Sequence, residues 1–220
     1  MIPISDSVPS IRFPFINVFL IIITVYVFYL ELTSPTQELF ISSYALIPST
    51  INFQDYHTLF PFITAIFLHG GFLHIASNLL FLWVFGDNVE GYLGWFLYIV
   101  LYLVSGIAGN LVQYFIMPSS QIPILGASGA IAGVLGAYYL LFPHSRIKTF
   151  VPFFGFFYSM LEIPAGFMLA YWFVLQLVSA TASLPGMAAS EGGVAFWAHV
   201  GGFAAGVLIV KLLGKERIYA

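Results

Sequence analysis

The 220-residue sequence has no cysteine and very little charge. Without thiols, the chain can form no disulfide and offers no thiolate metal ligand or cysteine nucleophile. Charged residues make up 7% of the chain, whereas soluble domains carry about 25%. A water-facing surface cannot be assembled from so few charges, and the small formal net charge of -3 does not suggest a nucleic-acid-binding protein.

The sequence is rich instead in long apolar stretches. Hydrophobic residues make up 60% of the chain, and the mean hydropathy is +0.99. A transmembrane helix needs about 20 largely apolar residues. We predict six such helices, at residues 13–32, 71–90, 93–116, 126–142, 153–183 and 194–213. The sequence therefore predicts an all-α membrane protein, a six-transmembrane-helix bundle that forms one domain over residues 1–220.

Three segments of this plan have special features. The stretch 126–142 is short, so we expect its start to lie below the membrane surface. The stretch 153–183 is long, and Pro164 within it predicts a kink or a boundary between loop and helix. Residues 33–70 are only moderately hydrophobic, and we expect this long first loop to lie in the membrane interface.

The cationic residues predict the orientation. If both termini are cytoplasmic, every lysine and arginine falls on the inner side: Arg12, Arg146, Lys148, Lys211, Lys215 and Arg217. The predicted outer loops then contain no lysine or arginine, as the positive-inside rule requires. This distribution also favours an even number of spans.

The topology brings three polar side chains to a similar depth. The second, fourth and sixth predicted helices all run from outside to inside, and His74, Ser128 and His199 lie near their outer ends. His74 and Asn78 are four residues apart and share a helix face. Two interpretations of that pair stay open: donors that point into one pocket, or ordinary hydrogen bonds between membrane helices.

Ser128 begins the fourth predicted helix within Gly126-Ala127-Ser128-Gly129. The free N–H groups at a helix N-terminus suit a developing oxyanion, although a serine there is also a common helix cap. Gly129 and Gly133 form a GxxxG step, which favours close helix packing in membranes.

His199 shares one face of the last predicted helix with Gly202 and Gly206. Those glycines allow the helix to pack flush on a neighbour, and His199 reaches Ser128 if that neighbour is the fourth helix. A histidine within a span indicates a functional site, with a hydrogen bond between helices as the alternative. Because no acidic residue lies at this depth, a Ser–His dyad is favoured over a triad, with histidine as the base.

At this point the motifs resemble a known family, the rhomboid intramembrane serine proteases of the prokaryotic six-helix type. The resemblance runs from about residue 57 to 212 and is carried by Phe67-Leu68-His69, His74 to Asn78, Gly86-Asp87-Asn88-Val89-Glu90, Gly126-Ala127-Ser128-Gly129, and Ala198-His199 with Gly201, Gly202 and Gly206.

The resemblance implies a function and a location. It implies cleavage of transmembrane segments of other membrane proteins near the outer membrane face, without a metal or other cofactor. The expected location is a prokaryotic plasma membrane, with the site opening toward the outside. The fifth predicted helix and residues 183–193 correspond to a mobile gate and cap in the family.

The resemblance also implies roles for individual residues. Ser128 is the expected nucleophile and His199 the expected general base. The Ser128 backbone N–H, His74 and Asn78 would form the oxyanion hole, and Gly126 would shape the turn beside it. His69 and Glu90 correspond to polar residues that have a structural role in the family.

Two departures from the family pattern stand out. Ala132 occupies the position one turn after the serine, where some rhomboids have an aromatic residue against the catalytic histidine. Tyr138, Tyr139 and Phe203 are the candidates for that support. The first loop, residues 33–70, also lacks the Trp-Arg pair that is common in many members.

Two other classes of function are alternatives to proteolysis. A non-catalytic relative that binds and escorts membrane proteins would not need Ser128 and His199. A metal carrier could use His69, His74 and His199, but no acidic residue is expected at midplane depth. The sequence also has neither the HExxH motif of zinc proteases nor a pair of mid-span aspartates.

Overall fold

The structure is a computed structural model that describes residues 1–153, 157–183 and 194–214. It is mostly helical. Its α-helices are α1 (Phe15–Thr33), α2 (Gln37–Tyr44), α3 (Pro61–Thr64), α4 (Phe72–Leu93), α5 (Trp95–Ile116), α6 (Ser128–Leu141), α7 (Ala165–Ala182) and α8 (Phe196–Leu212). The strands are β1 (Ile2–Asp6), β2 (Arg146–Phe153) and β3 (Phe157–Pro164).

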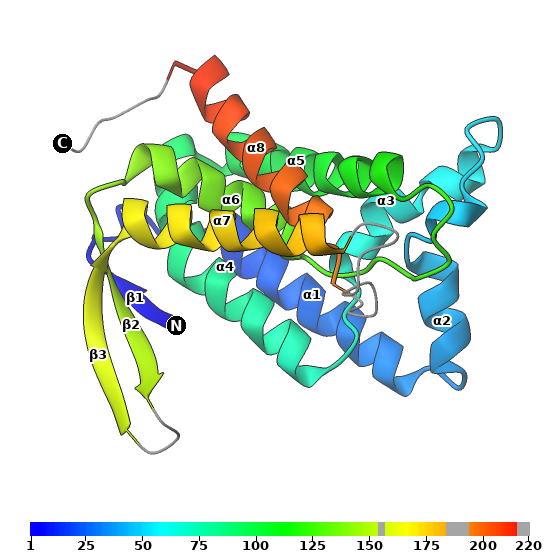
Figure 1. Cartoon of the computed structure of the whole chain (residues 1–220), viewed down its shortest axis with the longest axis horizontal. Coiled ribbons are helices and arrows are strands. Elements are labelled where there is room, and N and C mark those ends of the chain that lie inside the picture. The colour runs from blue at the N-terminus through cyan, green and yellow to red at the C-terminus, as the bar shows by residue number, and fades with distance from the viewer. Residues whose placement is uncertain (154–156, 184–193, 215–220) are drawn as a thin grey trace.

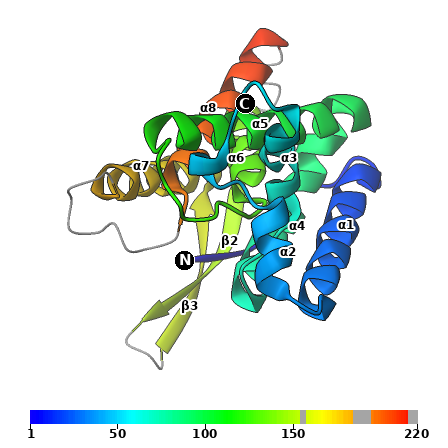
Figure 2. The same cartoon turned by 90° about the vertical axis from the view of Figure 1, so that its right-hand side faces the viewer.

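Helix α6 lies at the centre of the bundle. It packs against α4, α5, α7 and α8, and eleven of its 14 residues are buried. The views in Figures 1 and 2 show α1 and α7 on opposite flanks of this core, with α2 and α3 gathered at one end. The central position of α6 places Ser128, its first residue, inside the protein rather than on the lipid-facing surface.

The helices identify an integral membrane protein. Four of them, α1, α4, α5 and α7, have the length and hydropathy of membrane spans. Helices α6 and α8 are apolar but shorter, with 14 and 17 residues. At 1.5 Å per residue, α6 is about 21 Å long, shorter than the roughly 30 Å hydrocarbon layer.

The prediction of an all-α chain was wrong at the segment that precedes α7. The predicted span 153–183 becomes strand β3 up to Pro164 and a helix only from Ala165. Strands β2 and β3 pair antiparallel from Arg146↔Pro164 to Phe153↔Phe157, and β1 adds to β2 with Ile2 opposite Phe150. Pro164 marks the boundary because it cannot donate a backbone hydrogen bond.

The first loop contains only short helical segments. Between α1 and α4 lie α2, α3 and three 3-10 turns, η1 (Pro48–Thr50), η2 (Tyr56–Leu59) and η3 (Ala65–Phe67). The longest of these, α2, has eight residues. None of them is long enough to cross a bilayer.

Two carboxylates connect neighbouring elements by hydrogen bonds at the end of the bundle that carries the sheet (Figure 1). Glu90 on α4 is buried and accepts hydrogen bonds from the backbone N–H groups of Ile16 (3.0 Å) and Asn17 (2.7 Å), which caps α1. Asp6 on β1 accepts hydrogen bonds from the Tyr138 hydroxyl of α6 and the Asn88 amide of α4. Burial raises the pKa of Asp6 to about 6.

Candidate functional site

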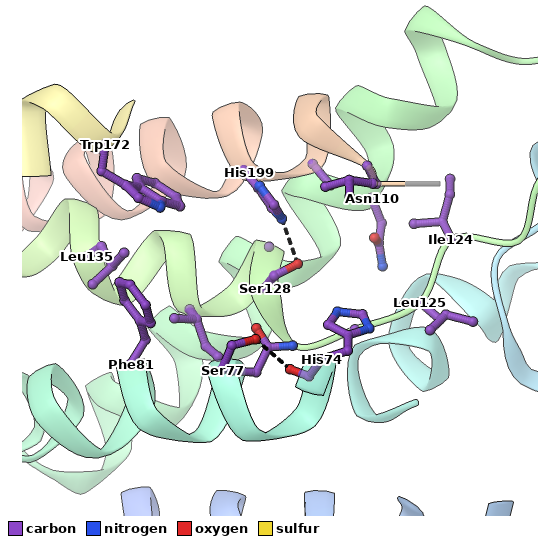
Figure 3. Close-up of a pocket in the computed structure, with 17 residues that line it drawn as sticks. His74, Ser77, Phe81, Asn110, Ile124, Leu125, Ser128, Leu135, Trp172 and His199 are labelled. Carbon is purple, nitrogen blue, oxygen red and sulfur yellow. Dashed lines mark hydrogen bonds between the residues drawn. The ribbon is translucent and has the colours of Figure 1, made fainter. Parts of the chain in front are cut away.

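Ser128 and His199 are in direct contact. The Ser128 Oγ lies 2.7 Å from the His199 Nε2 (Figure 3). The two residues come from α6 and α8, 71 positions apart in the chain. A hydroxyl at this distance from an imidazole nitrogen has the geometry of a nucleophile beside its base.

Glycine packing between α6 and α8 produces that short distance. A Cβ atom added to Gly206 would lie 1.9 Å from the Gly133 carbonyl oxygen, so the two backbones are in contact there. On Gly129 it would lie 3.5 Å from the Ala198 carbonyl oxygen. The glycine faces expected from the sequence therefore meet, and Ser128 and His199 lie at the N-terminal end of that contact.

Helix α7 supplies two further contacts to His199. The Gln176 Oε1 lies 2.7 Å from the His199 Nδ1. The Trp172 ring, one turn earlier, lies 6.0 Å from the imidazole centroid at an angle of 31°. Neither side chain was among the candidates predicted from the sequence.

None of the three aromatic candidates of the sequence analysis has this role among the described residues. Phe203 packs behind Trp172, with 6.3 Å between ring centroids, and Tyr139 packs on Phe203 at 6.1 Å. Tyr138 turns away toward Asp6. One signal in the sequence does point to Gln176: it is a strongly polar side chain in the middle of an apolar span.

His74, Asn78 and Gly126 lie on the other side of Ser128. Gly126 has a φ of +126°, and a Cβ there would lie 2.8 Å from the His74 Nε2, so this turn requires glycine. The Gly70 N–H donates to the His74 Nδ1 at 3.4 Å, which leaves Nε2–H as the donor that faces the turn. The Asn78 Nδ2 is buried without a hydrogen-bond partner among the described residues.

These side chains line one cavity of about 290 Å³. Figure 3 shows Phe81, Leu135 and Trp172 at one end of it, and His74 and Asn110 toward the other. Ser128 and His199 lie between the two ends. The cavity therefore joins an apolar compartment to a compartment with hydrogen-bond donors, a combination typical of small-ligand and substrate sites.

His69 and Glu90 lie outside this cavity. The fully buried His69 ring packs beside His74, with 5.0 Å between centroids, and its Nε2 accepts the Ala127 N–H at 3.5 Å. Burial lowers the pKa of His69 to about 4, so the ring is neutral at physiological pH. It supports the backbone one residue before Ser128.

The described residues contain no group of three histidine, cysteine, aspartate or glutamate side chains that could hold a metal ion. His69, His74 and His199, the set considered for a metal carrier, are not assembled as ligands. The two ring nitrogens of His199 make hydrogen bonds to Ser128 and Gln176 instead.

Comparison with known proteins identifies the family. The Rhomboid domain matches residues 56–216, which is most of the chain. The chain belongs to the rhomboid family. Rhomboid protein 1, mitochondrial, of Saccharomyces cerevisiae is 35% identical over 173 residues, covering 74% of this rhomboid and 46% of the yeast protein. Rhomboid-like protein 11, chloroplastic, of Arabidopsis thaliana is 30% identical over 174 residues, covering 77% and 58%.

A bacterial relative is named as a protease. Rhomboid protease GluP of Bacillus subtilis is 43% identical over 75 residues, which covers 34% of this rhomboid and 14% of GluP. The chain spans about half the length of the yeast and plant relatives. The relatives come from mitochondria, a chloroplast and a bacterium, so membership of the family places this protein in a membrane without specifying the organelle or cell.

Proposed function

We propose that this rhomboid is an intramembrane serine endopeptidase that cleaves transmembrane segments of other membrane proteins. The observation that carries the proposal is the 2.7 Å contact between Ser128 Oγ and His199 Nε2 beside the unpartnered Asn78 amide. A buried amide N–H without a partner costs about 1–3 kcal/mol. An oxyanion that forms during the reaction would satisfy it.

The proposed reaction passes through an acyl-enzyme. His199 takes the proton as the Ser128 Oγ forms a bond to the scissile carbonyl carbon. The oxyanion is bound by the Ser128 backbone N–H, the Asn78 amide and the His74 Nε2–H. His199 then gives its proton to the leaving amine as the C–N bond breaks. A water molecule, deprotonated by His199, hydrolyses the ester and regenerates Ser128.

The proposed topology has six crossings with both termini on the inner side. Helices α6 and α8 then cross with the four longer spans, and the sheet with Arg146 and Lys148 lies on the inner side. Ser128 and His199 lie near the N-terminal ends of α6 and α8, which in this topology are close to the outer surface. Lys215, Arg217 and most of the expected cap lie outside the described residues.

Labelling with a fluorophosphonate tests the proposal without knowledge of the natural substrate. The probe forms a bond to an activated serine oxygen and releases fluoride. We expect the wild-type protein in lipid vesicles to be labelled, and Ser128→Ala and His199→Ala to remain folded but unlabelled. In parallel, cleavage of a transmembrane reporter should be lost in both variants and unaffected by a metal chelator.

The same experiment distinguishes the non-catalytic alternative. A wild-type protein that stays unlabelled in lipid, and that retains but does not cut the reporter, would be a membrane-protein binding or escort protein. Full proteolysis by Ser128→Ala would show that the proposed nucleophile is wrong.

A further inference from the structure

The His199 imidazole makes hydrogen bonds through both of its ring nitrogens, and the second of these bonds has a chemical consequence. The Nε2 faces Ser128 and the Nδ1 faces the Gln176 Oε1, both at 2.7 Å. An amide oxygen accepts hydrogen bonds and cannot donate them. The Nδ1 in this arrangement therefore carries the proton, and the Nε2 has a free lone pair.

That tautomer is the one a general base requires. With the proton on Nδ1, the Nε2 accepts the Ser128 O–H and is ready to remove its proton. With the proton on Nε2, the ring would donate to Ser128 and could not act as its base. The neutral imidazole has no strong preference of its own, so the partner of Nδ1 selects the reactive form.

We propose that Gln176 is the positioning residue of the active site, which fixes the tautomer and the ring plane of His199 by accepting its Nδ1–H. The proposal rests on the function proposed above. The dyad expected from the sequence then becomes a hydrogen-bonded set of three residues, Ser128, His199 and Gln176, from α6, α8 and α7. Trp172 lies beside the same ring, with 6.0 Å between the ring centroids.

A glutamine suits this position in a membrane better than an aspartate. A carboxylate is costly to bury in a low-dielectric span, whereas a neutral amide offers the same acceptor oxygen without a charge. Gln176 is half-buried on α7. Among the described residues, the titratable group whose charge acts on His199 is His74 across the cavity on α4, while Ser128 and Trp172 face it from α6 and α7.

The orientation of the His199 imidazole therefore depends on the position of α7. The described residues of α7 that are buried are Ala165, Met168, Leu169 and Ala180. Near Gln176, α7 contacts α8 through Trp172 and Phe173, whose ring centroids lie 6.3 and 4.5 Å from that of Phe203. A displacement of α7 away from α8 would separate Gln176 and Trp172 from the imidazole together. The dyad is then fully oriented only while α7 is packed against α8.

Three variants in lipid vesicles test the proposal, with kcat and KM measured for a transmembrane reporter. Gln176→Leu removes the acceptor at nearly constant size, and we expect kcat to fall by about 10–100-fold with a smaller change in KM. Gln176→Glu keeps an acceptor oxygen, and we expect higher activity than in Gln176→Leu. Thr181→Val is the matched control, because its hydroxyl bonds to Val178 within α7.

The pH–rate profile separates positioning from simple packing. The carboxylate in Gln176→Glu stabilises the protonated imidazole, so we expect the acidic limb of the profile to move to higher pH. The control should keep the wild-type profile. Because Gln176→Glu preserves size and polarity, it remains informative even if Gln176→Leu does not fold.

Two results would overturn the assignment of Gln176. One is a wild-type kcat in Gln176→Leu. The other is equal loss in Gln176→Leu and Gln176→Glu with an unmoved acidic limb, which would mean that the side chain only fills space. Either result, with Ser128→Ala inactive, would leave the proposed protease intact. Activity in Ser128→Ala would instead refute the proposed function itself.

Discussion

Gly202 of α8 lies directly against Gly129 of α6: a Cβ on Gly202 would be 1.9 Å from the Gly129 carbonyl oxygen. Gly129 follows Ser128 in the chain, and Gly202 is one turn after His199. The spacing of the reacting atoms is thus set by a contact between two backbones. Backbone atoms cannot rotate away as a side chain can, so this contact tolerates no additional carbon.

We expect Gly202→Ala to separate α6 from α8. Overpacking of this kind costs about 1–3 kcal/mol or more, so the variant should melt at a lower temperature in detergent and lose fluorophosphonate labelling. Gly91→Ala on α4 is the matched control, because its added Cβ would meet Ile11 at an ordinary 3.9 Å. Equal melting temperatures for both variants would show that the α6–α8 contact yields more easily than its geometry indicates.

Removal of the unpartnered amide should affect the chemical step. We expect Asn78→Ala to lower kcat by about 100–1,000-fold, or about 3 kcal/mol, while the protein stays folded. Asn78→Asp keeps the size but replaces the donor with an acceptor, and it should be at least as inactive. Single-turnover cleavage of the reporter measures this directly. Wild-type kcat in Asn78→Ala would mean that other groups hold the oxyanion.

The buried Asp6 carboxyl predicts a pH dependence of stability. Its pKa is about 6 in the folded protein and 3.8 ordinarily, because burial disfavours the charge. The folded state thus binds the proton more tightly, so the contribution of Asp6 to stability falls as pH rises from about 4 to 6 and is constant above that range. Melting temperatures of the wild type and Asp6→Asn across pH 4.5–8 measure this effect.

We expect the stability of Asp6→Asn relative to the wild type to be highest above pH 6 and to decrease as the pH falls toward 4. The comparison with wild type cancels the other titrating groups. Parallel curves for the two proteins would contradict the prediction.

The helices and the positions of Ser128, His199, His74 and Asn78 followed from local patterns in the sequence. Apolar runs of sufficient length, glycine spacing and helix direction are all properties of neighbouring residues. The expected glycine faces meet in the structure, where the absence of side chains lets the backbones of α6 and α8 come into contact. Helix direction predicted the similar depth of these side chains, whereas the contact between Ser128 and His199 depended on α8 packing against α6, which the sequence left open.

The hairpin and the partners of His199 required contacts that hydropathy does not record. Residues 150–161 are mostly apolar, and an apolar strand cannot be distinguished from part of a buried helix by hydropathy alone. Gln176 was visible as a polar residue in a span. Its partner depended on how α7 rotates and packs against α8, which the weak amphipathicity of α7 does not specify.

The pairing of β1 with β2 has a consequence for synthesis. Asp6 is synthesised roughly 140 residues before its strand partner Ile147. At about 5–20 residues per second, β1 waits roughly 7–30 seconds before its partner exists. During that time α1, α4, α5 and α6 are all made. The hydrogen bonds of Asp6 to Asn88 and Tyr138 can likewise form only once those residues have been made, so the complete attachment of β1 is a late step of folding.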